Sequence, residues 1–76
     1  MTDIILQQHG MGMTSAIITE WRKAVGDRVE RGEIILEVEA AKATIEIESP
    51  ADGILTEILV QEEEEVPILT VLGRVE

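Results

Sequence analysis

The stretch EVEAAKATIEIESP, residues 37 to 50, decides how this chain folds. Apolar and polar residues alternate on both sides of its centre, as Ile-Leu-Glu-Val-Glu before it and Thr-Ile-Glu-Ile-Glu after it. Alternation with a period of two is typical of a β-strand with one buried and one solvated face. Lys42 stands between the two segments, with Ala41 and Ala43 beside it. The stretch therefore predicts a β-hairpin with a lysine in its turn.

The rest of the chain shows the same kind of pattern. Alternating or β-branched segments predict strands at 3–7, 16–21, 33–38, 43–48, 53–60 and 70–75. The residues between them favour turns: Gly10 and Gly12, Gly26-Asp27, Gly32, Ser49-Pro50 and Asp52-Gly53. No window sustains the spacing of an amphipathic helix over three turns. Short strands at close spacing predict an all-β fold, either a small sandwich or a flattened barrel.

An internal repeat becomes visible when the sequence is compared with itself at an offset of about 37 residues. The offset aligns SAIITEW (15–21) with DGILTEI (52–58), and GEIILEVE (32–39) with LTVLGRVE (69–76). Identical pairs are Ile17/Ile54, Thr19/Thr56, Glu20/Glu57, Val29/Val66, Val38/Val75 and Glu39/Glu76. The repeat predicts two similar sheets related by a pseudo-twofold axis, with the isoleucine and valine pairs in or near the shared core. The hairpin of Lys42 then lies opposite both termini.

Length and composition limit the classes of function. A chain of 76 residues allows one domain, 1–76, with a small core. The absence of cysteine excludes disulfides and thiolate zinc sites, and the apolar runs are too short to span a membrane. The start lacks the pattern of a signal peptide. A net charge of −10 argues against nucleic acid or an anionic membrane as partner and favours basic protein surfaces. We expect a cytoplasmic or mitochondrial-matrix setting.

Most catalytic arrangements of residues are missing. The sequence offers neither a Cys–His pair nor a Ser–His–Asp order, and GMGMTSA lacks the lysine of a phosphate-binding loop. The alternating Glu37, Glu39, Glu46 and Glu48 are interpreted as a solvated sheet face, and the acidic run 62–65 as a solvated turn. Lys42 differs, because a rigid hairpin with small neighbours gives it a fixed base and free reach. These are the physical requirements of a covalently modified arm.

Several segments resemble the lipoyl domain of the acyltransferase component of 2-oxo acid dehydrogenase complexes. They are GMGMT, ITEWRKAVGDRVERGE, ILEVEAAKATIEIESPADGILTEILV and VPILTVLGRVE, and the resemblance covers essentially the whole chain. It implies a barrel-sandwich hybrid, a flattened barrel of two four-stranded antiparallel sheets. It also implies that Lys42 bears lipoic acid in amide linkage, with no metal and no catalytic residue in the domain.

The resemblance further implies the partners of such an arm. A thiamine-dependent decarboxylase would load it with an acyl group, the acyltransferase core would pass the group to coenzyme A, and dihydrolipoamide dehydrogenase would reoxidise it. A lipoyl ligase or transferase would attach the cofactor. The domain would thus be a carrier and not itself an enzyme, while the parent chain would be a dihydrolipoyl acyltransferase.

Some residues depart from the family pattern. Ala41 stands where the family usually has aspartate, and the run 62–65 stands where a Gly-Asp pair is usual. Related biotinyl domains read Glu-Ala-Met-Lys-Met. Glu39 and Ala40 fit the start of that motif, but no methionine flanks Lys42. A biotin carrier of a carboxylase and an unmodified acidic interaction module therefore stay open as alternatives.

Overall fold

The computed structural model describes residues 1–8, 12–40 and 43–76. His9, Met11, Ala41 and Lys42 thus lie outside the described residues. The described part of the chain forms eight β-strands and no helix. The strands are β1 (Thr2–Ile5), β2 (Ser15–Trp21), β3 (Arg28–Val29), β4 (Ile34–Ala40), β5 (Ala43–Glu48), β6 (Gly53–Ile58), β7 (Glu65–Pro67) and β8 (Val71–Val75).

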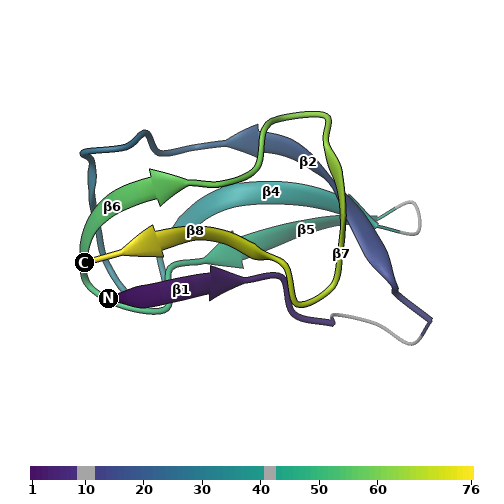
Figure 1. Cartoon of the computed structure of the whole chain (residues 1–76), viewed down its shortest axis with the longest axis horizontal. Coiled ribbons are helices and arrows are strands. Elements are labelled where there is room, and N and C mark those ends of the chain that lie inside the picture. Colours follow the sequence, from purple (N-terminus) through teal and green to yellow (C-terminus); the bar gives the residue numbers. More distant parts are fainter. Residues whose placement is uncertain (9–11, 41–42) are drawn as a thin grey trace.

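The strands form two antiparallel four-stranded sheets that face one another (Figure 1). One sheet has the order β1-β8-β6-β3 and the other the order β5-β4-β2-β7. Both sheets contribute buried side chains to one apolar core. The largest fully buried hydrophobic residues are Ile4, Leu6, Ile18, Ile35, Leu36, Leu55, Leu72, Val29, Val38 and Val75. This arrangement confirms the predicted all-β flattened barrel.

The predicted pseudo-twofold relation holds for topology and for local detail. Exchanging β1 with β5, β8 with β4, β6 with β2 and β3 with β7 converts one sheet order into the other. Strands β2 and β6 each carry an irregularity at the corresponding place, between Ile18 and Glu20 and between Leu55 and Glu57. The hydroxyl of Thr19 donates to the carbonyl of Glu37 at 2.8 Å. Its counterpart Thr56 donates to the carbonyl of Arg74 at 3.2 Å.

Two strands were not predicted from the pattern of residues. β3 has two residues and β7 has three, so neither is long enough to show alternation. Val29 of β3 and Val66 of β7 were nevertheless predicted from the repeat to lie in or near the core, and both are buried. The other strands agree with the predicted segments to within about two residues at each end, the usual scatter of strand boundaries.

The prediction that Ile17 and Ile54 pack in the core is wrong. Their side chains are 39% and 38% exposed, whereas the next residue in each strand, Ile18 and Leu55, is fully buried. Successive side chains of a strand point to opposite faces, so only one residue of each adjacent pair can enter the core. The repeat correctly paired the positions but did not show which member of each apolar pair faces inward.

Among the residues that the structure describes, two other than glycine adopt a left-handed backbone conformation. Glu63 has a φ of 70° and Leu69 a φ of 71°. In the repeat they correspond to Gly26 and Gly32, whose φ values are 99° and 88°. A side chain with a Cβ in this conformation costs about 1–2 kcal/mol because the Cβ approaches the following carbonyl. The second half of the chain therefore keeps the turn geometry of the first half without its glycines.

Replacing Glu63 by glycine is expected to raise the free energy of unfolding by about 0.5–1 kcal/mol. The relief of strain exceeds the extra entropy that glycine gives to the unfolded chain. The turn is fixed by tertiary hydrogen bonds, since the Glu63 amide donates to Ile18 and the Ile18 amide donates to Glu64. Urea denaturation measures the change. Glu63→Ala is the control, because it removes the charge but keeps the Cβ. Equal stabilisation by both variants would assign the effect to charge instead.

Candidate functional site

The β4–β5 hairpin is the candidate site. The two strands stay paired up to Ala40 and Ala43, so the connection between them consists of residues 41 and 42. This end of the hairpin lies opposite the two chain termini (Figure 1). Lys42 is outside the described residues, and its role as attachment residue stays a prediction. The structure places its two flanking strands at the predicted end of the molecule.

The hairpin is anchored along its whole inner face. Leu36, Val38 and Ala40 of β4 are buried, and so is Ile47 of β5. The paired positions Val38–Ile45 and Leu36–Ile47 place apolar residues of both strands on the same face. An isolated hairpin is only marginally stable in water, and packing of these apolar side chains on the core provides the additional stability. The backbone on both sides of residues 41 and 42 is consequently held by the core.

The outer face of the hairpin is acidic, as predicted. Glu39, Glu46 and Glu48 are exposed and Glu37 is half-buried, while their strand neighbours point inward. Glu37 pairs with Glu46 across the two strands, and Glu20 of β2 pairs with Glu37 from the other side. Three carboxylates thus lie in a row across β5, β4 and β2. Like charges directly opposite one another in a sheet are destabilising unless a cation lies near them.

Arg22, which follows β2, supplies that cation. Its guanidinium forms an ion pair with Glu37 and lies 3.7 Å from a carboxylate oxygen of both Glu20 and Glu46. In the other sheet a cation occupies the centre of the equivalent row, where Arg74 lies 3.1 Å from Asp3 and 3.2 Å from Glu57. The arginine of the acidic row was not identified from the sequence. The repeat contains the information that could have indicated this arginine. It aligns Glu37 with Arg74, so the row centred on Glu37 has no cation of its own and needs one from a neighbouring segment.

Lys23, the other lysine of the chain, is held by an ion pair. Its Nζ lies 2.9 Å from a carboxylate oxygen of Glu33. The hydrogen bond to Glu33 is the main cause that raises the pKa of Lys23 above its usual value, although partial burial opposes it. The same bond holds the pKa of Glu33 below its usual range. Lys23 therefore makes a structural contact on the domain surface, next to the end of β2.

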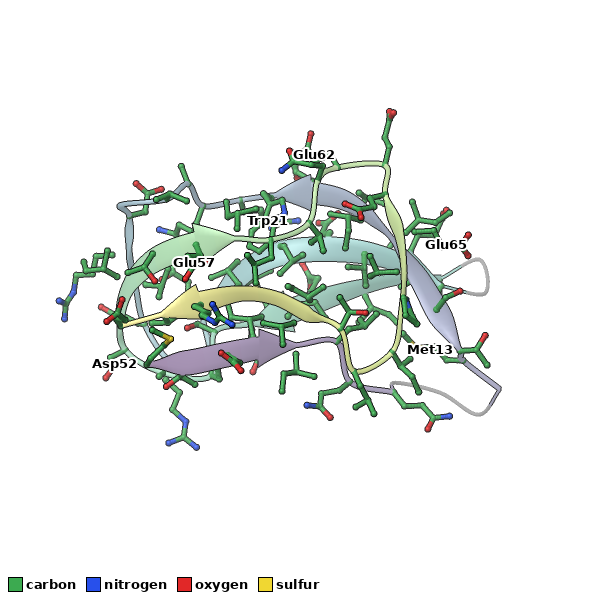
Figure 2. The ribbon with its side chains drawn as sticks, in the orientation of Figure 1. Met13, Trp21, Asp52, Glu57, Glu62 and Glu65 are labelled. Atoms are coloured by element: carbon green, nitrogen blue, oxygen red, sulfur yellow. The ribbon has the colours of Figure 1, made fainter. Side chains whose placement is uncertain are left out.

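The acidic run 62–65 has more structure than a solvated turn. All four glutamates are exposed, as predicted, but Glu65 belongs to β7 and accepts a hydrogen bond of 2.9 Å from the hydroxyl of Ser15. Glu62 accepts one of 3.1 Å from the amide of Trp21, and Glu64 one of 2.9 Å from the amide of Gln61. Glu62 and Glu65 are labelled in Figure 2. Glu62 and Glu65 therefore tie this segment to β2, and Glu64 stabilises the turn from within.

Trp21 closes the core beside this turn. Its ring is partly buried against the core cluster, and its indole N–H donates to the carbonyl of Val60 at 3.1 Å. Met13 is buried and belongs to the same core cluster. In the described segments, no three histidine, cysteine or acidic residues lie where they could hold a metal ion. No helix there is long and apolar enough to cross a membrane.

Comparison with known families adds to this geometry. The family model for biotin and lipoyl attachment, described as "Biotin-requiring enzyme", matches residues 2–75. The chain belongs to this family of biotin- and lipoyl-attachment domains.

Relatives of this biotin/lipoyl attachment domain are acyltransferase components. It is 42% identical to the dihydrolipoyllysine-residue acetyltransferase component of the pyruvate dehydrogenase complex of Corynebacterium glutamicum, over 97% of this chain and 11% of that protein. It is also 42% identical to the corresponding component of the acetoin cleaving system of Bacillus subtilis, over 84% of this chain and 16% of that protein. The chain thus spans less than a fifth of the length of these relatives.

A solved structure shares the fold of this attachment domain. The lipoyl domain of the 2-oxoglutarate dehydrogenase complex of Azotobacter vinelandii superimposes with a TM-score of 0.81 at 28% identity. The match covers the whole of this chain and 96% of that one. Together with the acyltransferase relatives, this likeness identifies the chain as a lipoyl-type carrier domain and does not favour the biotin carrier or the unmodified module.

Proposed function

We propose that the domain carries a lipoyl group in amide linkage on Lys42 and presents it to the active sites of a 2-oxo acid dehydrogenase complex. The observation that carries this proposal is the β4–β5 hairpin. Its strands are paired up to Ala40 and Ala43 and are packed on the core, so only residues 41 and 42 remain to connect them. Lys42 is the only lysine in that connection.

The residues around the connection suit such a group. The cofactor needs one primary amine on a fixed base, and no pocket is required to hold a covalently linked arm. Ala43 is exposed and small, so no bulky side chain of that residue obstructs an approaching ligase. When bound, the lipoyl group supplies a disulfide that takes up an acyl group and two reducing equivalents. The chain supplies the position from which the arm reaches each partner.

The proposal extends to the partners. A thiamine-dependent decarboxylase loads the arm, the acyltransferase core receives the acyl group, and dihydrolipoamide dehydrogenase restores the disulfide. The names of the relatives support this, because they are acyltransferase components of pyruvate and 2-oxoglutarate dehydrogenase complexes. In the same proposal the domain is not itself catalytic, and its parent chain is a dihydrolipoyl acyltransferase of the bacterial cytoplasm. A linked carrier turns encounters between sites into intramolecular events at roughly millimolar effective concentration.

Coexpression with modifying enzymes tests the proposal. We expect a lipoate ligase to add one lipoyl group per chain and a biotin ligase to add none, because no methionine flanks Lys42 as in biotinyl domains. Intact-mass spectrometry counts the adducts, and the mass of the peptide around residue 42 locates them. The Lys23→Arg variant serves as the matched control and should be modified like the wild type. A biotin adduct, or a chain that neither ligase modifies, would contradict the proposal.

A further inference from the structure

Leu69 combines a strained backbone with an exposed side chain. It lies in the turn between β7 and β8, has a φ of 71°, and is 67% exposed. Hydrogen bonds hold the turn in place, since the Leu69 amide donates to Leu6 and the Leu6 amide donates to Thr70. The corresponding residue of the first half is Gly32, which adopts the same conformation without a Cβ. Folding stability therefore does not explain a leucine here, and strain that persists without structural gain points to function.

Two other exposed apolar residues lie nearby: Pro67, two residues before Leu69 in β7, and Ile17 in the paired strand β2. Pro67 of β7 pairs with Ser15 of β2, and Ile17 of β2 pairs with Glu65 of β7. Val66 between them is buried, so Pro67 and Glu65 share the outer face. We name Ile17, Pro67 and Leu69 the β7 patch.

The β7 patch and the hairpin lie at the same end of the molecule. Ile17 pairs with Glu39 of β4, one residue before the end of that strand. Because β2 runs antiparallel to β4, Ser15 and its partner Pro67 lie still nearer the hairpin end. Figure 1 shows β7 crossing this end, away from both termini. A partner seated on the patch would therefore have the arm of Lys42 within reach.

The charge around the patch indicates what kind of partner it fits. Glu39 and Glu65 flank Ile17 in the sheet and are exposed, and the acids 62–64 precede β7. With a net charge of −10, a second copy of the chain would be repelled. The complementary surface has an apolar pocket with lysine or arginine side chains at its rim, the usual plan of a protein interface.

We propose that the β7 patch is the surface by which the decarboxylase recognises this domain, with Leu69 inserted into an apolar pocket beside basic residues. The inference rests on the proposed function, because it names the contact surface of a partner assigned there. Contact at the patch holds the hairpin at the entrance of the partner's active site. The side chain of Leu69 then lowers the stability of the fold but strengthens binding to the partner.

The experiment measures stability and acylation on the same variants. Wild type, Leu69→Gly, Leu69→Met, Ile17→Ser and Ile54→Ser are lipoylated to completion, as checked by mass. The probes are the decarboxylases of the C. glutamicum pyruvate dehydrogenase complex and the A. vinelandii 2-oxoglutarate dehydrogenase complex. We expect Leu69→Gly to raise the unfolding midpoint yet lower kcat/KM for reductive acylation roughly five- to tenfold, the size of a moderate interface contact. Leu69→Met should restore most of the rate, since it keeps an apolar side chain.

The two isoleucine variants form a matched pair. Ile17 and Ile54 are equally exposed and occupy corresponding places in the two sheets, but only Ile17 lies in the patch. Ile17→Ser should slow acylation and Ile54→Ser should not. Unchanged acylation in Leu69→Gly, equal losses in both serine variants, or a fully lipoylated wild type that neither decarboxylase acylates would each overturn the inference.

These outcomes are distinct from a failure of the proposed function, which would show as a chain without a lipoyl adduct. In that case NMR titration of the unmodified chain with each decarboxylase still tests the patch. Shift changes confined to the segments around Ile17 and Leu69 would support it, and their absence would contradict it.

Discussion

Replacing Lys42 by arginine abolishes lipoylation and all acyl transfer through this domain, if the attachment site is as proposed. Arginine keeps the positive charge and a similar length, but its guanidinium does not lose a proton under any condition a ligase works in. It therefore cannot form the amide. The free energy of unfolding should change by no more than about 0.5 kcal/mol, as for other surface substitutions. Mass spectrometry after coexpression with a lipoate ligase measures the first effect, and urea denaturation the second.

The matched control is Lys23→Arg, which should leave modification complete. Lys23 is paired with Glu33, and this hydrogen bond raises the pKa of its amine. Lys23 follows β2 and lies outside the β4–β5 connection, so a ligase that recognises that hairpin should not modify it. A lipoyl adduct that persists in Lys42→Arg, or that disappears in Lys23→Arg, would show that Lys42 is not the attachment residue.

Truncating the buried member of each central apolar pair should have the largest effect on stability. Ile18→Ala and Leu55→Ala are each expected to lower the free energy of unfolding by about 2–5 kcal/mol, through lost burial and the cavity left behind. Both side chains are fully buried, at equivalent places in opposite sheets. A domain of 76 residues has a total stability of about 4–11 kcal/mol, so either change removes a large part of it.

The adjacent residues provide the controls. Ile17→Ala and Ile54→Ala remove the same kind of side chain one position away, where more than a third of it is exposed. Their cost should stay below about 1 kcal/mol, because little burial is lost. Thermal or urea unfolding of the four variants gives the comparison. Equal costs at Ile17 and Ile18 would mean that the β2 strand does not present alternate faces as described.

The β4–β5 hairpin was predictable because its information is local. Alternation along residues 33–38 and 43–48 sets the strands, and the small residues between them set the turn. The observed strand Ala43–Glu48 has the predicted bounds, and Ile34–Ala40 differs from the prediction only at its ends. The repeat predicted the arrangement of the remaining strands, because it implies that β2 and β6 occupy equivalent places in opposite sheets, as observed. The candidate site followed from the same two signals, with Lys42 in the predicted turn.

The sequence by itself determined the all-β class, the pseudo-twofold relation and the hairpin that contains Lys42. A period of two between neighbouring residues and a repeat between the two halves are both visible in the order of residues alone. Tertiary structure decided the rest. It made strands of two and three residues at β3 and β7, which exist only because longer strands pair with them. It turned Ile18 and Leu55 inward in place of Ile17 and Ile54. It imposed a left-handed backbone on Glu63 and Leu69 through hydrogen bonds to residues distant in sequence, and no local preference could have predicted that conformation.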